Sequence, residues 1–291
     1  MLARATAGPC APRPPQDPAV AAAARSALAA LVGAGGVVVL SGAGISTESG
    51  IPDYRGPTGS ARRAAPMTYQ AFTGDAVARR RYWARSHLGW RLVAGAEPNA
   101  GHRAVARLEA RGLVTAVITQ NVDGLHQAAG ARGVVDLHGR LDRVTCLGCR
   151  RLGPRDELDR RLRAANAGWA PQAGAVNPDG DVELADSQLD GFRTVDCTAC
   201  GGVLKPDVVF FGETVPPERV RACYGLLERA RALLVLGSSL TVMSGHRFVL
   251  RAARQGMPVA IVNQGATRGD PYASVVVDAS LGEVLPELAA A

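Results

Sequence analysis

Residues 37–46 read Val-Val-Val-Leu-Ser-Gly-Ala-Gly-Ile-Ser. The four apolar residues at 37–40 have the length of a buried β-strand, and the Gly-x-Gly that follows is typical of a strand that turns into a helix. Such a turn brings backbone N–H groups close to a pyrophosphate near the start of a helix. Thr47 occupies the place of the third glycine in the complete dinucleotide fingerprint. By itself, the motif is equally compatible with a dinucleotide site and with an ordinary tight turn.

Apolar segments of strand length recur along the chain and alternate with helical stretches. We expect further strands at residues 114–119, 134–137, 208–211, 233–236, 259–262 and 275–277. We expect helices at residues 19–31, 75–93, 102–111, 218–230 and 245–254. Short apolar strands that alternate with helices indicate a parallel sheet covered on both faces. The predicted fold class is therefore α/β, with a Rossmann-like parallel sheet domain.

The alternation stops between about residue 141 and residue 205, where two Cys-x-x-Cys pairs occur. Cys146 and Cys149 form the first pair, and Cys197 and Cys200 form the second. Two such pairs complete a tetrahedral Cys₄ site for one Zn²⁺, which is structural because protein fills all four positions. We expect a flexible leader at 1–18, the Rossmann-like domain at 19–140 and 205–291, and a smaller zinc-binding insertion domain at 141–204.

Composition narrows the classes of protein to which the chain can belong. With 291 residues, 34 Gly and 18 Pro it is not a coiled coil, and no apolar run of about 18 residues predicts a membrane span. The net charge of +7 comes from scattered arginines with few aromatics between them, which indicates compositional bias and no specific nucleic-acid site. Residues 1–18 show no secretory signal. We expect a cytoplasmic, bacterial-type protein; a short organellar transit peptide, and hence a mitochondrial location, is the alternative.

Polar residues follow several expected strands. Gln120, Asn121 and Asp123 come directly after the strand at 114–119, where amides and a carboxylate can bind a ligand or cap the next helix. His138 follows the strand at 134–137 and is either a general base or a hydrogen-bonded structural group. The segment from Lys205 to Glu213 is either a core strand or an edge that pairs with an extended peptide. The remaining histidines are expected to be structural.

Taken in order, these segments resemble the sirtuins, the NAD-dependent protein deacylases. The resemblance covers about residues 20–288, and its ordered motifs are together far more specific than any one alone. Tyr54, the segment at 82–85 and the segment at 239–245 resemble the class II branch of that family. The matching segments are residues 42–46, 49–55, 119–123, 138–139, the four cysteines, 205–213, 237–239 and Asn263.

The resemblance implies a set of binding residues for NAD⁺ and for the substrate. The implied pyrophosphate contacts are Gly42, Ala43, Gly44 and Ile45. The implied loop over the nicotinamide ribose is Asp53, Tyr54 and Arg55. The implied nicotinamide pocket is Gln120, Asn121, Val122 and Asp123. The implied adenosine contacts are Gly237, Ser238, Ser239, Asn263, Gln264, Gly265 and Leu281. The residues implied to pair with the substrate backbone are Val208, Val209, Phe210, Phe211, Gly212 and Glu213.

The resemblance also implies the reaction. The acyl oxygen of an acylated lysine attacks the anomeric carbon as nicotinamide leaves, and His138 removes a ribose hydroxyl proton so that the 2′ oxygen can take the acyl group. Asn121 and Asp123 complete the implied catalytic set. The partners are acylated-lysine proteins, with no membrane and no specific nucleic acid. Two alternatives are a protein ADP-ribosyltransferase that uses the same NAD site and a non-catalytic NAD or ADP-ribose binding module.

The identity of the acyl group depends on one pair of residues. Tyr82 and Arg85 are three apart in an expected helix and therefore share a face. The pair resembles the one with which acid-selective sirtuins hold a succinyl or malonyl carboxylate, since a guanidinium binds a carboxylate bidentately. The alternatives are that Tyr82 is a core residue of a generally basic helix, and that acetyl, longer acyl or lipoyl-type groups are preferred.

Overall fold

The computed structural model describes residues 12–14, 17–54, 66–172, 174–177 and 179–291. Most of the expected leader, and Arg55 of the expected cofactor loop, lie outside the described residues. Within the leader, the guanidinium of Arg13 is 2.7 Å from the carboxylate of Asp270.

The larger part of the fold is a six-stranded parallel sheet with the strand order β3-β2-β1-β7-β8-β9. The chain begins this sheet at β1, moves to the β3 edge and returns to continue from β7. The strand order therefore reverses between β1 and β7, and ligands bind outside the carboxyl ends of the strands at such a point. The strands are β1 (Val37–Ser41), β2 (Val114–Thr119), β3 (Val134–Asp136), β7 (Ala232–Leu236), β8 (Val259–Val262) and β9 (Val275–Val277).

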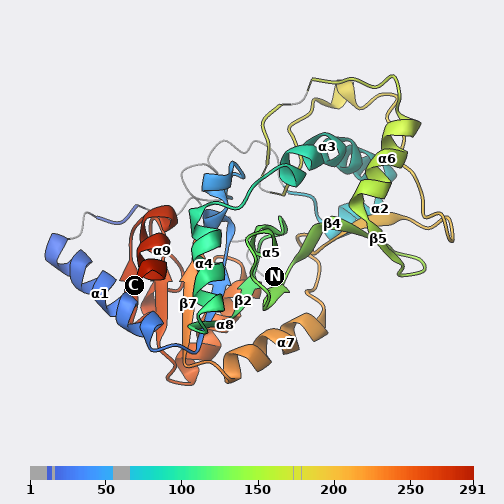
Figure 1. The fold of residues 1–291 in the computed structure, drawn as a ribbon. Helices are drawn as coiled ribbons and strands as arrows, with labels where there is room; N and C mark the ends of the chain where they lie inside the picture. Colours follow the sequence, from blue (N-terminus) through green and yellow to red (C-terminus); the bar gives the residue numbers. More distant parts are fainter. Residues whose placement is uncertain (1–11, 15–16, 55–65, 173, 178) are drawn as a thin grey trace, which may run out of the picture.

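Helices cover both faces of this sheet (Figure 1). Side chains alternate between the two faces of a strand. Val37 and Val39 accordingly join one hydrophobic core, with α1 (Pro18–Gly33), α4 (Ala100–Ala110) and α9 (Leu281–Ala290). Val38 and Leu40 join the other, with α7 (Pro217–Glu228) and α8 (Met243–Arg254). All five residues of β1 are buried, and this strand lies between β2 and β7 in the middle of the sheet.

A smaller module stands at one end of the sheet (Figure 1). It contains a three-stranded antiparallel sheet in the order β5-β4-β6 and a separate hydrophobic core. Its elements are α2 (Tyr69–Gly74), α3 (Ala76–Ala94), β4 (Gly139–Cys146), β5 (Leu152–Pro154), α6 (Arg155–Ala165) and β6 (Leu204–Val208). We keep residues 141–204 as the proposed insertion, with α2, α3 and β6 completing its core.

One expected strand is corrected. The segment at 208–211 is not a strand of the parallel sheet; β6 ends at Val208 and pairs antiparallel with β4. The chain after β6 folds back because the Glu213 carboxylate accepts a hydrogen bond from the Phe210 amide at 2.8 Å and lies 3.1 Å from Lys205 Nζ. Phe211 keeps only an isolated bridge to Thr68.

The other expected helices and strands are confirmed within two residues or so at each end. Helix α9 was not expected. None of the described helices has the length and apolarity needed to cross a membrane. The short elements are α5 (Leu125–Ala128) and the 3₁₀ turns at Ala43–Ile45, Thr47–Ser49, Asp186–Gln188 and Asp270–Tyr272.

Candidate functional site

A cavity of about 550 Å³ opens at the carboxyl ends of β1 and β7 and continues into the smaller module. Three expected site residues that the structure describes, apart from the cysteines, do not line it: Ile45, Arg85 and Gly265. The expected residues that do line it are Gly42, Ala43, Gly44, Asp53, Tyr54, Gln120, Asn121, Val122, Asp123, His138, Tyr82, Val208, Val209, Phe210, Phe211, Gly212, Glu213, Gly237, Ser238, Ser239, Asn263, Gln264 and Leu281.

The loops after β1 and β7 touch through their glycines. The Gly44 amide donates to the Gly237 carbonyl at 2.9 Å. A Cβ on Gly44 would lie 2.8 Å from Gly237 Cα, and one on Gly42 would lie 2.7 Å from Ser238 Cβ. These loops therefore exclude side chains and leave backbone facing the cavity, as a bound pyrophosphate requires. The donor set fits a dinucleotide phosphate group.

Side chains that follow β2 connect these two loops. Gln120 Nε2 donates to Ser238 Oγ at 2.8 Å, across the point where the strand order reverses. Asn121 Nδ2 donates to the Gly42 carbonyl at 3.1 Å. The cavity floor is thus one hydrogen-bonded unit built from the ends of β1, β2 and β7.

Ser46 is the centre of a buried polar network. Its Oγ donates to Asp123 Oδ2 at 2.7 Å, accepts from Asn121 Nδ2 at 3.0 Å and lies 3.5 Å from His102 Nε2. A hydroxyl offers one donor and two acceptor positions, so three partners saturate it. Burial raises the pKa of Asp123, while hydrogen bonds from the Leu125 amide and from Ser46 oppose the shift. The network fixes an amide and a carboxylate at the cavity wall.

Two buried histidines, His102 and His126, lie next to this network. The rings of His102 and His126 lie 5.0 Å apart, and both are fully buried. Burial lowers the pKa of His102 to about 3 and that of His126 to about 4, so both are neutral at pH 7. His126 Nε2 lies 2.9 Å from Ser41 Oγ at the end of β1. Neither ring lines the cavity, in keeping with a structural role.

His138 is held at both ring nitrogens. Nδ1 lies 2.9 Å from the Gln120 carbonyl oxygen, and Nε2 lies 2.8 Å from Ser244 Oγ. A carbonyl only accepts hydrogen bonds, so Nδ1 carries the proton and Nε2 keeps its lone pair. Burial lowers the pKa of His138 to about 4, so the ring is neutral at pH 7. His138 Nε2 is therefore a base that faces the cavity.

The expected acyl-reading pair separates in the structure. Tyr82 lines the cavity and packs edge-on against Phe72 and Phe210, at ring-centroid distances of 5.4 and 5.1 Å. The guanidinium of Arg85 instead lies 3.1 Å from the Asp181 carboxylate and 3.6 Å from that of Glu183. The expectation that both side chains point into one channel thus fails for Arg85, because two acids from a later loop hold it.

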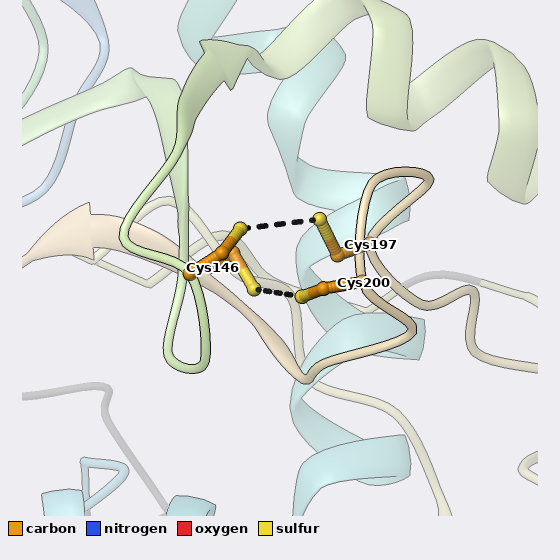
Figure 2. A group of neighbouring side chains, drawn as sticks. Cys146, Cys197 and Cys200 are labelled. Carbon is orange, nitrogen blue, oxygen red and sulfur yellow. Dashed lines mark hydrogen bonds between the residues drawn. The ribbon is translucent and has the colours of Figure 1, made fainter.

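The four expected metal ligands come together. Their Sγ atoms lie within 4.8 Å of one another; the separation is 3.5 Å for Cys146–Cys200 and 3.8 Å for Cys149–Cys197. Figure 2 shows the thiol groups pointing toward one another from two loops. Tetrahedral zinc with bonds of about 2.3 Å needs sulfurs about 3.8 Å apart. The site fits one Zn²⁺, and none of its four cysteines lines the cavity.

Sequence reasoning missed several cavity residues. Ser244, at the start of α8, lies against His138. Its only sequence signal is its place in the family-like segment at 239–245. Asp179 lies in a Gly/Pro/Asp-rich loop that carries no periodic signal. Val93 and Leu141 are ordinary apolar residues that line the cavity because of how α3 and β4 pack.

The chain is similar in sequence to a known protein family and to several bacterial enzymes. The Sir2 family model matches residues 42–244. NAD-dependent protein deacetylase 1 of Streptomyces coelicolor is 66% identical over 88% of this chain and 86% of its own length. NAD-dependent protein deacetylase 1 of Mycobacterium avium is 53% identical over 87% of this chain and 90% of its own.

The solved structures agree with these relatives. A Sir2 structure with a p53 peptide and NAD⁺ has a TM-score of 0.71 at 31% identity, over 90% of this chain and 95% of that one. Another Sir2 enzyme structure has a TM-score of 0.72 at 33% identity, over 92% and 96% of the two chains. The chain therefore belongs to the Sir2 family.

Proposed function

We infer that this chain is an NAD-dependent protein deacetylase, which transfers the acetyl group of a modified lysine to ADP-ribose and releases nicotinamide. One observation carries the inference: a neutral histidine, with its proton on Nδ1 and the lone pair of Nε2 toward the Ser244 hydroxyl, lines a cavity that joins a glycine-lined crevice to an apolar module. A protein that only bound NAD would not need that base. The names of the bacterial relatives support the same activity.

When bound, NAD⁺ supplies an anomeric carbon with a cationic leaving group and the hydroxyls that receive the acyl group. The glycine loops would hold its phosphates, and Gln120, Asn121 and Asp123 would surround the nicotinamide end. His138 Nε2 would accept a proton from a ribose hydroxyl, while the Gln120 carbonyl keeps the ring in the productive tautomer. Binding within the cavity would shield the anomeric carbon from water, which would otherwise hydrolyse it.

The protein substrate is expected to lie along Val208 to Glu213, the segment between the two modules. The ion pair of buried Lys205 with half-buried Glu213 fixes the shape of this segment, since the ammonium also donates to the carbonyls of Pro206 and Val208. Acylated-lysine proteins are the proposed partners. We also propose a cytoplasmic location, because thiolate ligands persist in a reducing compartment.

The pH dependence of the reaction tests the role of His138. A histidine with a pKa of about 4 is a competent base at every pH well above 4, and it loses this ability as the pH falls through 4. We expect kcat/KM for an acetyl-lysine peptide to be flat from roughly pH 5.5 to 8 as far as this group is concerned, in contrast to an exposed histidine with its usual pKa of about 6.5. A drop in kcat/KM with a midpoint near 6.5 would contradict the assignment.

Replacing Ser46 by Ala tests the buried network. Asp123 and Asn121 would each lose a partner, and leaving buried polar groups unsatisfied costs about 1–3 kcal/mol, or about 5–150-fold in kcat/KM. Steady-state nicotinamide release measures the effect. Ser49→Ala is the matched control, since no hydrogen-bond partner of the Ser49 hydroxyl is found among the described residues and it does not line the cavity. Equal activities of the two variants would remove Ser46 from the mechanism.

The activity itself is tested by incubating an acetyl-lysine peptide with NAD⁺ and following nicotinamide. We expect one nicotinamide for each lysine freed and no deacetylation without NAD⁺. Deacetylation that proceeds without NAD⁺ would contradict the proposal.

A further inference from the structure

A second hollow, of about 330 Å³, lies between α7 and α8 on the side of these helices that faces away from the sheet. The opposite sides of the two helices are buried in the core under the sheet, through Cys223 and Leu227 of α7 and Phe248 and Val249 of α8. The outward side is polar. We call this hollow the arginine groove; its lining residues are Tyr224, Glu228, Arg247, Leu250, Arg251 and Arg254.

Positive charge exceeds negative charge in the arginine groove. Glu228 is the one acid among the described lining residues, and its carboxylate lies 3.1 Å from the guanidinium of Arg251. Arg247 and Arg254 have no ion pair within the described part of the chain. The residues outside that part include no aspartate and no glutamate, so no further carboxylate of this chain is available to them. Two guanidinium groups of the groove are therefore left for an anion from another molecule.

The arginine groove meets the cavity at Arg247, which lines both. Arg247 follows Ser244 by three residues on α8, so it lies on the same side of the helix as the hydroxyl that contacts the proposed base. Three large apolar residues that line the cavity are exposed, which marks the open mouth of the cavity: Phe211, Val242 and Met243. A substrate chain that leaves the mouth along α8 thus reaches Arg247 first.

The three arginines form a row that helix stability explains only in part. Arg251 and Arg254 are in the last turn of α8, where cations interact favourably with the helix dipole. Arg247 is in the middle of the helix, beyond the reach of that effect, and its bond to the Met243 carbonyl is 3.4 Å long. From Arg247, the other two lie about 6 and about 10 Å along the helix axis. An extended peptide covers these distances with about two and about three residues.

We propose that the arginine groove binds acidic residues on one side of the acylated lysine, so that the enzyme prefers protein substrates with Asp or Glu within a few residues of that lysine. This proposal rests on the inferred deacetylase function and adds a substrate class to it. The groove favours a peptide over a single-stranded nucleic acid because Tyr224 is its one aromatic residue, and the Arg251 guanidinium lies over that ring at 6.0 Å. Nucleic-acid grooves stack successive bases on several open rings.

The test compares three acetyl-lysine peptides with NAD⁺ and the full chain. One has neutral flanks, one has a run of glutamates on the amino side of the lysine, and one has the same run on the carboxyl side. An exposed ion pair is worth about 1.4–5-fold, so two pairs predict an advantage of up to about 25-fold in kcat/KM for one acidic peptide over the neutral one. We expect the gain in KM, because the flanking charges do not change during the reaction. It should vanish at about 1 M salt, where the Debye length is about 3 Å.

The double variant R251Q/R254Q is expected to lose the acidic advantage and to keep native kcat/KM for the neutral peptide, since neither residue lines the cavity. R103Q/R107Q is the matched control. It removes two exposed arginines from α4, on the opposite face of the sheet, and should keep the advantage. Glu228→Gln removes the acid of the groove and frees Arg251, so we expect it to enlarge the advantage by about 1.4–5-fold. This variant tests the proposal even if R251Q/R254Q folds poorly.

Several results would overturn the proposal. These are native protein without an acidic preference, an equal preference for both acidic peptides, and an equal loss of preference in R251Q/R254Q and R103Q/R107Q. The last two would show that the net charge of the whole chain acts, with no part for the groove. A single-stranded oligonucleotide that inhibits the native protein and not R251Q/R254Q, without any acidic preference, would identify a nucleic-acid site. Turnover of the neutral peptide would leave the deacetylase function standing in each case. If no peptide is turned over with NAD⁺, that function fails, and this proposal fails with it.

Discussion

Replacing His138 by Ala is expected to lower kcat/KM for NAD-dependent deacetylation by about 10²–10⁴-fold, the contribution typical of a positioned general base. The reason is the geometry of its ring. The Gln120 carbonyl at 2.9 Å fixes the proton on Nδ1 and leaves Nε2 with the lone pair. The second partner of the ring is Ser244 Oγ, at 2.8 Å from Nε2, and a neutral hydroxyl does not take the place of a basic imidazole nitrogen. Steady-state kinetics with an acetyl-lysine peptide measures the loss.

Two controls make this result specific. NAD⁺ binding, measured by calorimetry, is expected to persist, because the glycine loops and Gln120 are unchanged. His246→Gln alters another buried histidine, on α8, which packs against Tyr272 at 5.9 Å and does not line the cavity. We expect near-native turnover from that variant. A His138→Ala variant as active as His246→Gln would remove His138 from the mechanism.

Replacing Cys146 or Cys197 by Ser is expected to abolish stable folding. Binding of structural zinc contributes about 10–16 kcal/mol in small domains, as much as the whole stability of a typical protein, about 5–15 kcal/mol. Both side chains are buried within the core of the smaller module, so their loss removes packing as well as the ion. Elemental analysis should find one zinc per chain in the native protein, and thermal unfolding followed by circular dichroism measures the loss.

Cys223 provides the matched control for the zinc site. It is a fully buried residue of α7, in a different hydrophobic core from Cys146 and Cys197, and burial raises the pKa of its thiol to about 12. Cys223→Ala should therefore lose some packing energy while keeping one zinc and a cooperative transition. Native protein that is folded and active with no zinc would contradict the Cys₄ assignment.

The parallel sheet could be predicted from sequence because its strands are apolar along their whole length. In β1 and β7 every residue is buried, and such runs have few other interpretations. Helix α9 was not predicted because Pro286 lies inside it. Its buried residues nevertheless have the spacing of one helical face: Leu281, Val284, Leu285 and Leu288. The strand at 204–208 was misplaced because its buried lysine and proline resemble a loop, and only the contact with Glu213 and the pairing with β4 make it a strand.

The site could be predicted where a strand end carries it. Asn121, Asp123 and His138 follow strands whose carboxyl ends meet, so their gathering follows from the topology. The partners of Arg85 could not be found in this way. Asp181 lies 96 residues further along the chain, in a loop with no periodic pattern, and only the packing of Gly89 against Gly180 brings the two together. A three-residue spacing shows which face of a helix two side chains share, but it does not show what faces them.

The most direct test of the central claim is mass spectrometry of the products formed from an acetyl-lysine peptide and NAD⁺. The account predicts peptide lighter by one acetyl group, free nicotinamide and acetyl-ADP-ribose in equal amounts, with His138→Ala forming none of them at a comparable rate. Peptide or protein that gains ADP-ribose while its lysine stays acetylated would contradict the account and identify an ADP-ribosyltransferase. NAD⁺ that is bound and recovered unchanged, with the peptide still acetylated, would identify a binding module.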